Sequence, residues 1–89
     1  MPAKVEVYFT TYCHYCRRAM HLLDSKGIDY ERFDVTNDPD RRAWLREATG
    51  RHTVPQIFIN GKSVGGSDDI HELDAAGKLD RMLSEPPVG

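Results

Sequence analysis

The first hydrophobic pattern along the chain is an alternation that predicts a strand. From Lys4 to Phe9, β-branched and aromatic residues recur at every second position. The period then changes, and from His14 to Lys26 the apolar side chains recur at the spacing of one helical face: Cys16, Ala19, Met20 and Leu23. Gly27 follows as a stop signal. The pattern predicts a strand followed by an amphipathic helix.

The same two patterns then repeat. Residues Tyr30 to Val35 alternate again, and a helix between two strands makes those strands parallel, with a right-handed crossover. Asp38 and Pro39 are the N-cap and first-turn residues typical of a second helix, and Gly50 is its expected end. Its buried face is expected to comprise Trp44, Leu45 and Ala48.

A hairpin is the clearest prediction in the second half of the chain. Two short apolar segments, Gln56 to Ile59 and Lys62 to Val64, flank the dipeptide Asn60-Gly61. Both residues of this dipeptide tolerate the positive φ angles of a type I′ turn. The last two strands are therefore expected to be antiparallel neighbours.

A third helix is expected after Gly65-Gly66. Ser67 or Asp68 is the expected cap, and the helix is expected to end near Gly77. A short continuation carries the last apolar residues: Leu79, Met82 and Leu83. The element order β-α-β-α-β-β-α predicts an α/β fold with one mixed four-stranded sheet.

Length and charge limit the possible functions. At 89 residues the chain has room for one domain, expected over residues 1–84, with residues 85–89 as a flexible tail. Twelve basic and fourteen acidic side chains give a net charge of −2, without the basic tract typical of nucleic-acid or membrane-surface binding. No signal peptide or apolar run of about 20 residues is seen, so a cytoplasmic location is expected.

Cys13 and Cys16 are the only cysteines, and only two residues separate them. A disulfide between them closes too short a loop to staple a fold. A zinc site needs about four ligands, and the histidines do not form a second closely spaced pair. A reactive dithiol is the remaining interpretation.

The position of the two cysteines predicts different roles for them. Cys13 lies where a strand gives way to a helix, and the unpaired N–H groups and dipole of a helix N-terminus favour a thiolate. Cys16 belongs to the apolar stripe and is expected to stay protonated. Cys13 is thus the expected nucleophile on a disulfide, and Cys16 the thiol that resolves the mixed disulfide.

Two other segments allow more than one interpretation. Thr53-Val54-Pro55 contains either an ordinary loop proline or a cis bond that presents the Val54 backbone to an extended ligand. The segment Gly66 to Asp69 is either a simple helix cap or an anion site at a helix N-terminus.

Three segments together, "CHYC", "TVPQIFING" and "VGGSDD", resemble the glutaredoxins of the thioredoxin-fold superfamily, specifically the small bacterial dithiol class. The resemblance extends from Val5 to about Leu83. It implies a thioredoxin-like fold whose four-stranded mixed sheet is flanked by three or four helices, with the third strand antiparallel to the first.

The resemblance also implies a reaction. Glutaredoxins reduce protein-glutathione mixed disulfides and protein disulfides, with glutathione as co-substrate and without a tightly bound cofactor or metal. It makes Cys13 and Cys16 catalytic, and it implies a glutathione groove formed by Tyr15, Thr53, Val54, Pro55, Gly66, Ser67 and Asp68. The implied partners are glutathione and glutathionylated or disulfide-bonded proteins, ribonucleotide reductase among them, and a monomer is expected.

The chain departs from the family pattern near the cysteines. His14 stands where dithiol members commonly carry proline, and Thr10 stands where they carry a lysine that meets the glycyl carboxylate of glutathione. We expect Arg42 or His52 to supply part of that missing charge. His14 and Thr10 are expected to tune the site, since a protonated His14 favours a thiolate at Cys13.

Two alternative functions follow from these departures. A non-proline residue at the position of His14 is compatible with a dimer in which Cys13 of each chain and two glutathiones hold a [2Fe–2S] cluster. The missing lysine is compatible with an electron donor to ribonucleotide reductase that thioredoxin reductase serves.

Overall fold

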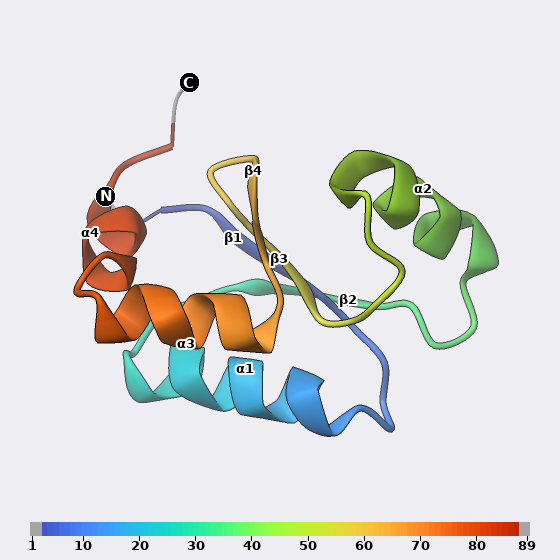
Figure 1. Ribbon diagram of the computed structural model, residues 1–89, viewed down its shortest axis with the longest axis horizontal. Coiled ribbons are helices and arrows are strands. Elements are labelled where there is room, and N and C mark those ends of the chain that lie inside the picture. The colour runs from blue at the N-terminus through green and yellow to red at the C-terminus, as the bar shows by residue number, and fades with distance from the viewer. Residues whose placement is uncertain (1–2, 88–89) are drawn as a thin grey trace.

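The structure is a computed structural model that describes residues 3–87 (Figure 1). Its elements, in chain order, are β1 (Val5–Phe9), α1 (His14–Ser25), β2 (Glu31–Asp34), α2 (Pro39–Thr49), β3 (Gln56–Ile59), β4 (Lys62–Gly65), α3 (Ser67–Ala75) and α4 (Leu79–Ser84). The predicted order of strands and helices is confirmed, with the final continuation as a separate short helix.

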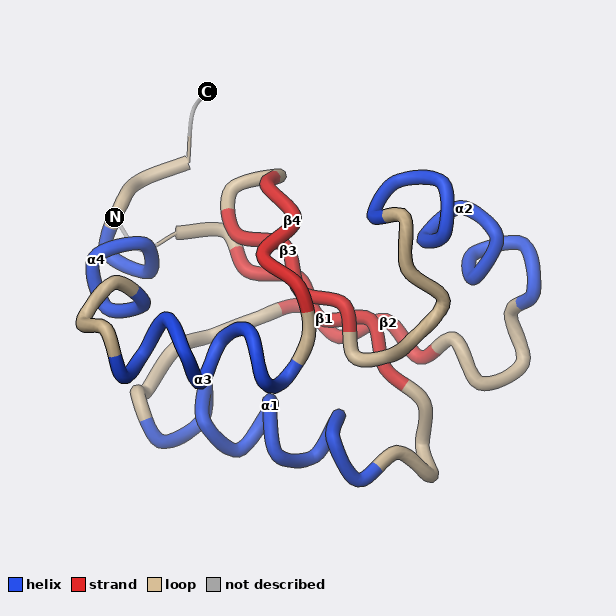
Figure 2. The backbone as a smooth tube through the Cα atoms, viewed as in Figure 1, coloured by secondary structure: helices blue, strands red, loops and turns tan. Residues whose placement is uncertain are grey.

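One mixed sheet carries the fold, with its strands in the order β2-β1-β3-β4 (Figure 2). β1 pairs with β2 in parallel, as the intervening helix requires, and with β3 in antiparallel orientation. β3 and β4 form the predicted hairpin, whose turn has φ angles of 52° at Asn60 and 79° at Gly61. The predicted topology is confirmed, including the antiparallel third strand.

Helices cover both faces of the sheet. α1 and α3 lie side by side against one face, and α2 lies against the other (Figure 1). The larger core fills the α1 and α3 side and includes Val5 and Val7 of β1. The smaller core, on the α2 side, consists of Tyr8, Val35, Leu45 and Phe58. Since both faces are covered, β1 buries Tyr8 as well as its alternating valines.

The expected buried face of α2 is wrong at two of its three positions. Leu45 is buried, but Ala48 is exposed and Trp44 is 46 % exposed. The Trp44 ring contacts Tyr8 and Phe58, at centroid distances of 5.6 and 5.9 Å. Within residues 3–87, α2 is the only helix on this face of the sheet, so no second helix packs beside it there (Figure 1). Helical spacing alone does not show how many partners a helix face has.

The N-caps of α2 and α3 show where these two helices begin. The Asp38 carboxylate accepts the Arg41 N–H at 3.0 Å, so the predicted cap of α2 is confirmed. The expected cap of α3 is wrong, because Gly66 is its N-cap and Ser67 and Asp68 already lie in the first helical turn. The cap is supplied instead from within the helix, where the Asp69 carboxylate accepts the Gly66 N–H at 2.8 Å.

The C-terminal segment contacts the hairpin turn. The Asn60 side-chain amide donates to the carbonyls of Glu85, at 3.0 Å, and Pro86, at 3.4 Å. The last two residues of the expected tail lie outside the described residues. Among the helices within residues 3–87, none combines the length and hydropathy that a membrane crossing requires.

Candidate functional site

Cys13 lies at the N-cap of α1, where the chain leaves β1 and turns into the helix. Its sulphur accepts the backbone N–H of Cys16 at 3.1 Å. Its thiol donates to the carbonyl of Val54 at 3.5 Å, across the gap between two loops. The side chain is half-buried. Cys13 is thus accessible, and a helix N–H points at its sulphur, which confirms its predicted position at the junction of strand and helix.

Cys16 lies one turn further along α1 and has no exposed surface. Burial is the main cause that raises the pKa of its thiol to about 12, and the neighbouring Cys13 adds to the effect. Both cysteines are in the free thiol form. This agrees with the prediction that the Cys16 thiol stays protonated at neutral pH.

The loop opposite the cysteines contains the Val54–Pro55 peptide bond, which is cis. Of the two interpretations of this proline, the cis form is therefore correct. Pro55 is buried, Val54 is half-buried and Thr53 is exposed. The fully buried Gln56 holds this loop in place, because its side-chain amide donates to the Thr53 carbonyl at 2.9 Å. Sequence reasoning missed this contact, although a glutamine in an otherwise apolar strand was a signal for it.

The start of α3 forms the next part of the site. Ser67 is 4 % exposed, and its hydroxyl oxygen has no hydrogen-bond partner among the described residues. Asp69 forms an ion pair with Arg51 at 2.7 Å, which joins this helix start to the loop before Thr53. The Arg51 hydrogen bond, and then the Gly66 N–H, lower the pKa of Asp69. The sequence analysis gave Arg51 no role and missed the capping role of Asp69.

These segments enclose a groove of about 200 Å³. Its lining residues, which define the α3 groove, are Tyr15, Arg51, Thr53, Val54, Pro55, Gly66, Ser67, Asp68 and Asp69. Tyr15 is 54 % exposed, and Asp68 is exposed beside it on the rim. Every residue that the resemblance assigned to a ligand groove therefore lines this one. Because the Val54 carbonyl also accepts the Cys13 thiol, the groove begins beside Cys13.

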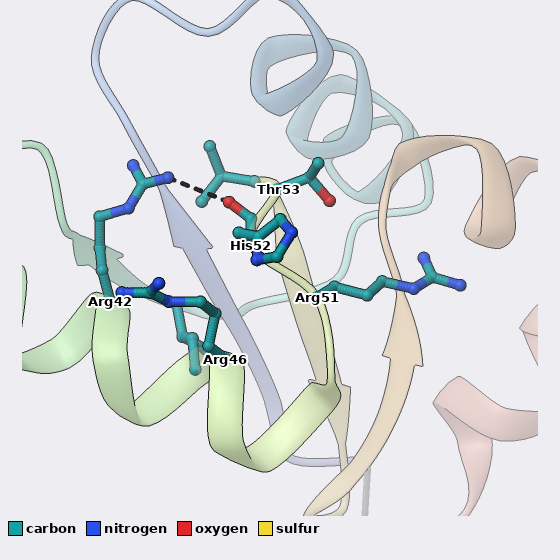
Figure 3. A pocket seen from close by; sticks show the side chains of 7 residues that line it. Arg42, Arg46, Arg51, His52 and Thr53 are labelled. Atoms are coloured by element: carbon teal, nitrogen blue, oxygen red, sulfur yellow. Dashed lines mark hydrogen bonds between the residues drawn. The ribbon is translucent and has the colours of Figure 1, made fainter.

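A second cavity, of about 240 Å³ (Figure 3), adjoins the α3 groove, because Arg51, Thr53 and Val54 line both. It is called the basic cavity here because Arg51 and most of its other lining residues are cationic or titratable: Arg42, Leu45, Arg46 and His52. Arg42 donates to the His52 carbonyl at 3.2 Å, which fixes the arginine over the loop. The structure thus brings Arg42 and His52 together, next to the groove.

Thr10 and His14, the two expected tuning residues, lie on different sides of the cysteine loop. Thr10 is 2 % exposed, and its hydroxyl oxygen has no hydrogen-bond partner among the described residues. Its carbonyl accepts the Cys13 N–H at 3.4 Å. His14 is exposed in the first turn of α1, with its ring 6.0 Å from that of Tyr15. Thr10 is therefore buried next to the cysteine loop, and His14 is exposed.

Comparison with known proteins identifies the family. A family profile described as glutaredoxin matches residues 5–64. The chain belongs to the glutaredoxin family. The glutaredoxin of Pseudomonas aeruginosa is 48 % identical over 80 residues, which cover 90 % of this chain and 95 % of that protein. Glutaredoxin 3 of Escherichia coli is 43 % identical over 81 residues, which cover 91 % of this chain and 98 % of that protein.

Solved glutaredoxin structures share the whole fold. The crystal structure of a buckwheat glutaredoxin-glutathione complex superimposes with a TM-score of 0.86 at 38 % identity, covering 91 % of this chain and 76 % of that one. The holo form of glutaredoxin C1 from a poplar hybrid gives 0.85 at 36 % identity, covering 92 % of this chain and 77 % of that one.

Membership of the family and the geometry of the pair establish the chemistry of this glutaredoxin. It is a thiol-disulfide oxidoreductase with a redox-active dithiol, Cys13 and Cys16. In such an exchange a thiolate attacks a disulfide sulphur, and the other sulphur leaves with the electron pair of the broken bond. The accessible sulphur of Cys13 suits the first attack, and the buried thiol of Cys16 suits the second.

Proposed function

We propose that this glutaredoxin reduces protein-glutathione mixed disulfides with glutathione as the electron donor, and protein disulfides through both cysteines. The Cys13 thiolate attacks the glutathione sulphur of the substrate, and the protein leaves as a thiolate that takes up a proton. A second glutathione thiolate then attacks the glutathione sulphur on Cys13. Oxidised glutathione forms, and the Cys13 thiolate is restored.

One observation carries the proposal: the buried Ser67 hydroxyl, which has no partner within residues 3–87, lies at the start of α3, in the groove that begins beside Cys13. Buried polar groups without partners are rare in proteins, and a ligand that bonds to this hydroxyl would account for its burial. Backbone N–H groups at a helix start attract a carboxylate. In the proposed complex, the γ-glutamyl end of glutathione meets Ser67 and Asp68, while Tyr15 forms the wall of the groove.

The Val54 carbonyl provides a link between the reaction and binding. In the free protein it accepts the Cys13 thiol. Once Cys13 carries glutathione it has no proton to donate, and the carbonyl is released to accept the cysteinyl N–H of the tripeptide in a strand-like contact. Thr53 and Pro55 flank that contact. The glycyl carboxylate then points toward the basic cavity.

The test is turnover of a glutathionylated peptide, coupled to glutathione, glutathione reductase and its nicotinamide reductant. We expect robust turnover that Cys13→Ser abolishes and Cys16→Ser retains, because a second glutathione can replace Cys16. Cys16→Ser is expected to lose the reduction of a protein disulfide. Turnover that requires thioredoxin reductase in place of glutathione would refute the proposal.

The basic cavity provides a finer test of the same proposal. Substitution of Arg42 or His52 with alanine is expected to raise the KM for glutathione about two- to fivefold, as for loss of a solvent-exposed polar contact to the carboxylate. Arg81→Ala is the matched control, since this exposed arginine lies in α4, away from α2 in Figure 1. If neither cavity variant raises the KM above that of the control, the glycyl carboxylate binds elsewhere.

A further inference from the structure

Gln56 is a polar side chain inside the core that the proposed reaction has not used. It begins β3, and the three residues after it, Ile57 to Ile59, are buried and apolar. Gln56 itself has no exposed surface, and its side-chain oxygen has no hydrogen-bond partner within residues 3–87. Burial of an amide oxygen without a partner lowers stability relative to an apolar side chain of the same size. Stability alone therefore does not account for a glutamine here.

The nitrogen of the Gln56 amide has two partners, and both belong to Thr53. It donates to the Thr53 carbonyl at 2.9 Å and to the Thr53 hydroxyl oxygen at 3.4 Å. A carbonyl only accepts hydrogen bonds, so the amide nitrogen and not the oxygen must face it, and the two amide hydrogens allow both bonds at once. Thr53 lies before the cis Val54–Pro55 bond and is exposed. A buried side chain thus holds an exposed loop residue at two atoms.

Thr53 occupies a position that the two cavities share. It lines both the α3 groove and the basic cavity, where the proposed complex passes from one to the other. The ion pair of Arg51 with Asp69, which also holds this loop, is exposed, so water competes for it. The Gln56 amide contacts Thr53 from within the core, where hydrogen bonds are stronger. It is therefore well placed to fix the position of Thr53.

We propose that Gln56 is a positioning residue for glutathione recognition, because its amide sets the Thr53 backbone and hydroxyl at the wall of the α3 groove before the tripeptide binds. The inference rests on the proposed function and names a residue that determines its selectivity. Gln56 lines neither cavity, so it acts on the ligand only through Thr53. A loop that is already fixed in the free protein loses little conformational entropy on binding, and this raises the affinity.

The exchange chemistry at Cys13 is expected not to depend on Gln56. The Cys13 sulphur accepts the Cys16 N–H within the first turn of α1, apart from the Thr53 loop. A mixed disulfide whose small thiol has no peptide backbone undergoes the same exchange without using the groove. Loss of the Gln56 amide should therefore slow the reaction of a glutathione disulfide and spare that of a disulfide with mercaptoethanol.

The experiment compares two mixed disulfides of one peptide, with glutathione and with mercaptoethanol, in a single turnover. Each is mixed with reduced protein and quenched with acid, and the released peptide thiol is followed by mass spectrometry. The ratio of the two rates, normalised to the same ratio for dithiothreitol, measures recognition of glutathione. Gln56→Met removes the amide and keeps an unbranched side chain of similar size. We expect it to lower this ratio about three- to tenfold, as for loss of a neutral hydrogen bond.

Ile57→Met is the matched control, because Ile57 is equally buried in β3 but belongs to the larger core, and it should keep the wild-type ratio. The urea midpoint of Gln56→Met should not fall, since the substitution also removes the unpartnered oxygen. An equal fall of the ratio in both variants would overturn the inference, and so would a fall accompanied by a lower urea midpoint. A high wild-type ratio that Gln56→Met retains would overturn the inference alone, whereas a wild-type ratio near one would refute the proposed function as well.

Discussion

The turn into α3 allows a quantitative prediction, because one glycine and one carboxylate share its space. Gly65 has a φ of +98°, and a Cβ added there would lie 2.6 Å from Cγ and 2.8 Å from Cβ of Asp69. The variant Gly65→Ala must therefore accept a strained backbone and also displace Asp69. That displacement breaks the hydrogen bond from the Gly66 N–H to the Asp69 carboxylate, which is 2.8 Å long.

The two effects add up to a large loss of stability. A side chain held at such a φ costs about 1–3 kcal/mol. A hydrogen bond to a charged acceptor contributes about 1.5–3 kcal/mol. We expect Gly65→Ala to lower the free energy of unfolding by about 3–5 kcal/mol, a large part of the roughly 5–15 kcal/mol of a domain.

Urea denaturation followed by circular dichroism measures this loss, with Gly77→Ala as the matched control. Gly77 also has a positive φ, +74°, but a Cβ there meets nothing within 4 Å. The control therefore carries the backbone strain alone, about 1–2 kcal/mol. The reasoning is refuted if Gly65→Ala is no less stable than Gly77→Ala. Because Gly65 precedes the α3 groove, a raised KM for glutathione is expected in Gly65→Ala and not in the control.

Three further predictions follow from single contacts. The pKa of Asp69 is lowered in the folded protein. Its carboxylate therefore contributes stability above about pH 4, and this contribution is lost as the pH falls through the pKa that Asp69 has in the folded state. The wild type should therefore have a higher urea midpoint than Asp69→Asn at pH 7, and this difference should be smaller at pH 3. Lys26 lies 2.6 Å from Asp74 and 2.7 Å from Asp80, so Lys26→Met should lower the urea midpoint by an amount that added salt reduces. His14→Pro should shift the reduction potential measured against glutathione buffers, and an unchanged value would exclude tuning by His14.

The sequence predicted best those features that short-range pattern determines. Alternation located the strands, Asp38 located a helix start, and Asn60-Gly61 located the hairpin turn. The spacing of the cysteines, with the strand before them and the helix after them, was enough to place one sulphur at the helix cap and bury the other.

The features that the sequence did not predict depend on contacts between distant segments. Arg51 and Asp69 are 18 residues apart, and neither pattern nor propensity pairs them. Trp44 fits a helical stripe but is 46 % exposed, and in the described part of the chain α2 has no second helix beside it on that face of the sheet (Figure 1). The capping of α3 by Asp69 in place of Ser67 follows from where the glycine turn ends, which is a backbone property.

One measurement tests most directly the central claim that Cys13 attacks the glutathione sulphur of a mixed disulfide. The Cys16→Ser protein, which cannot resolve an adduct, is mixed with a glutathionylated peptide, quenched with acid and weighed by intact-mass spectrometry. The account predicts one glutathione on Cys13, with the peptide released as a free thiol. Peptide retained on Cys13 with glutathione released, or an equal adduct on the Cys13→Ser protein, would contradict it.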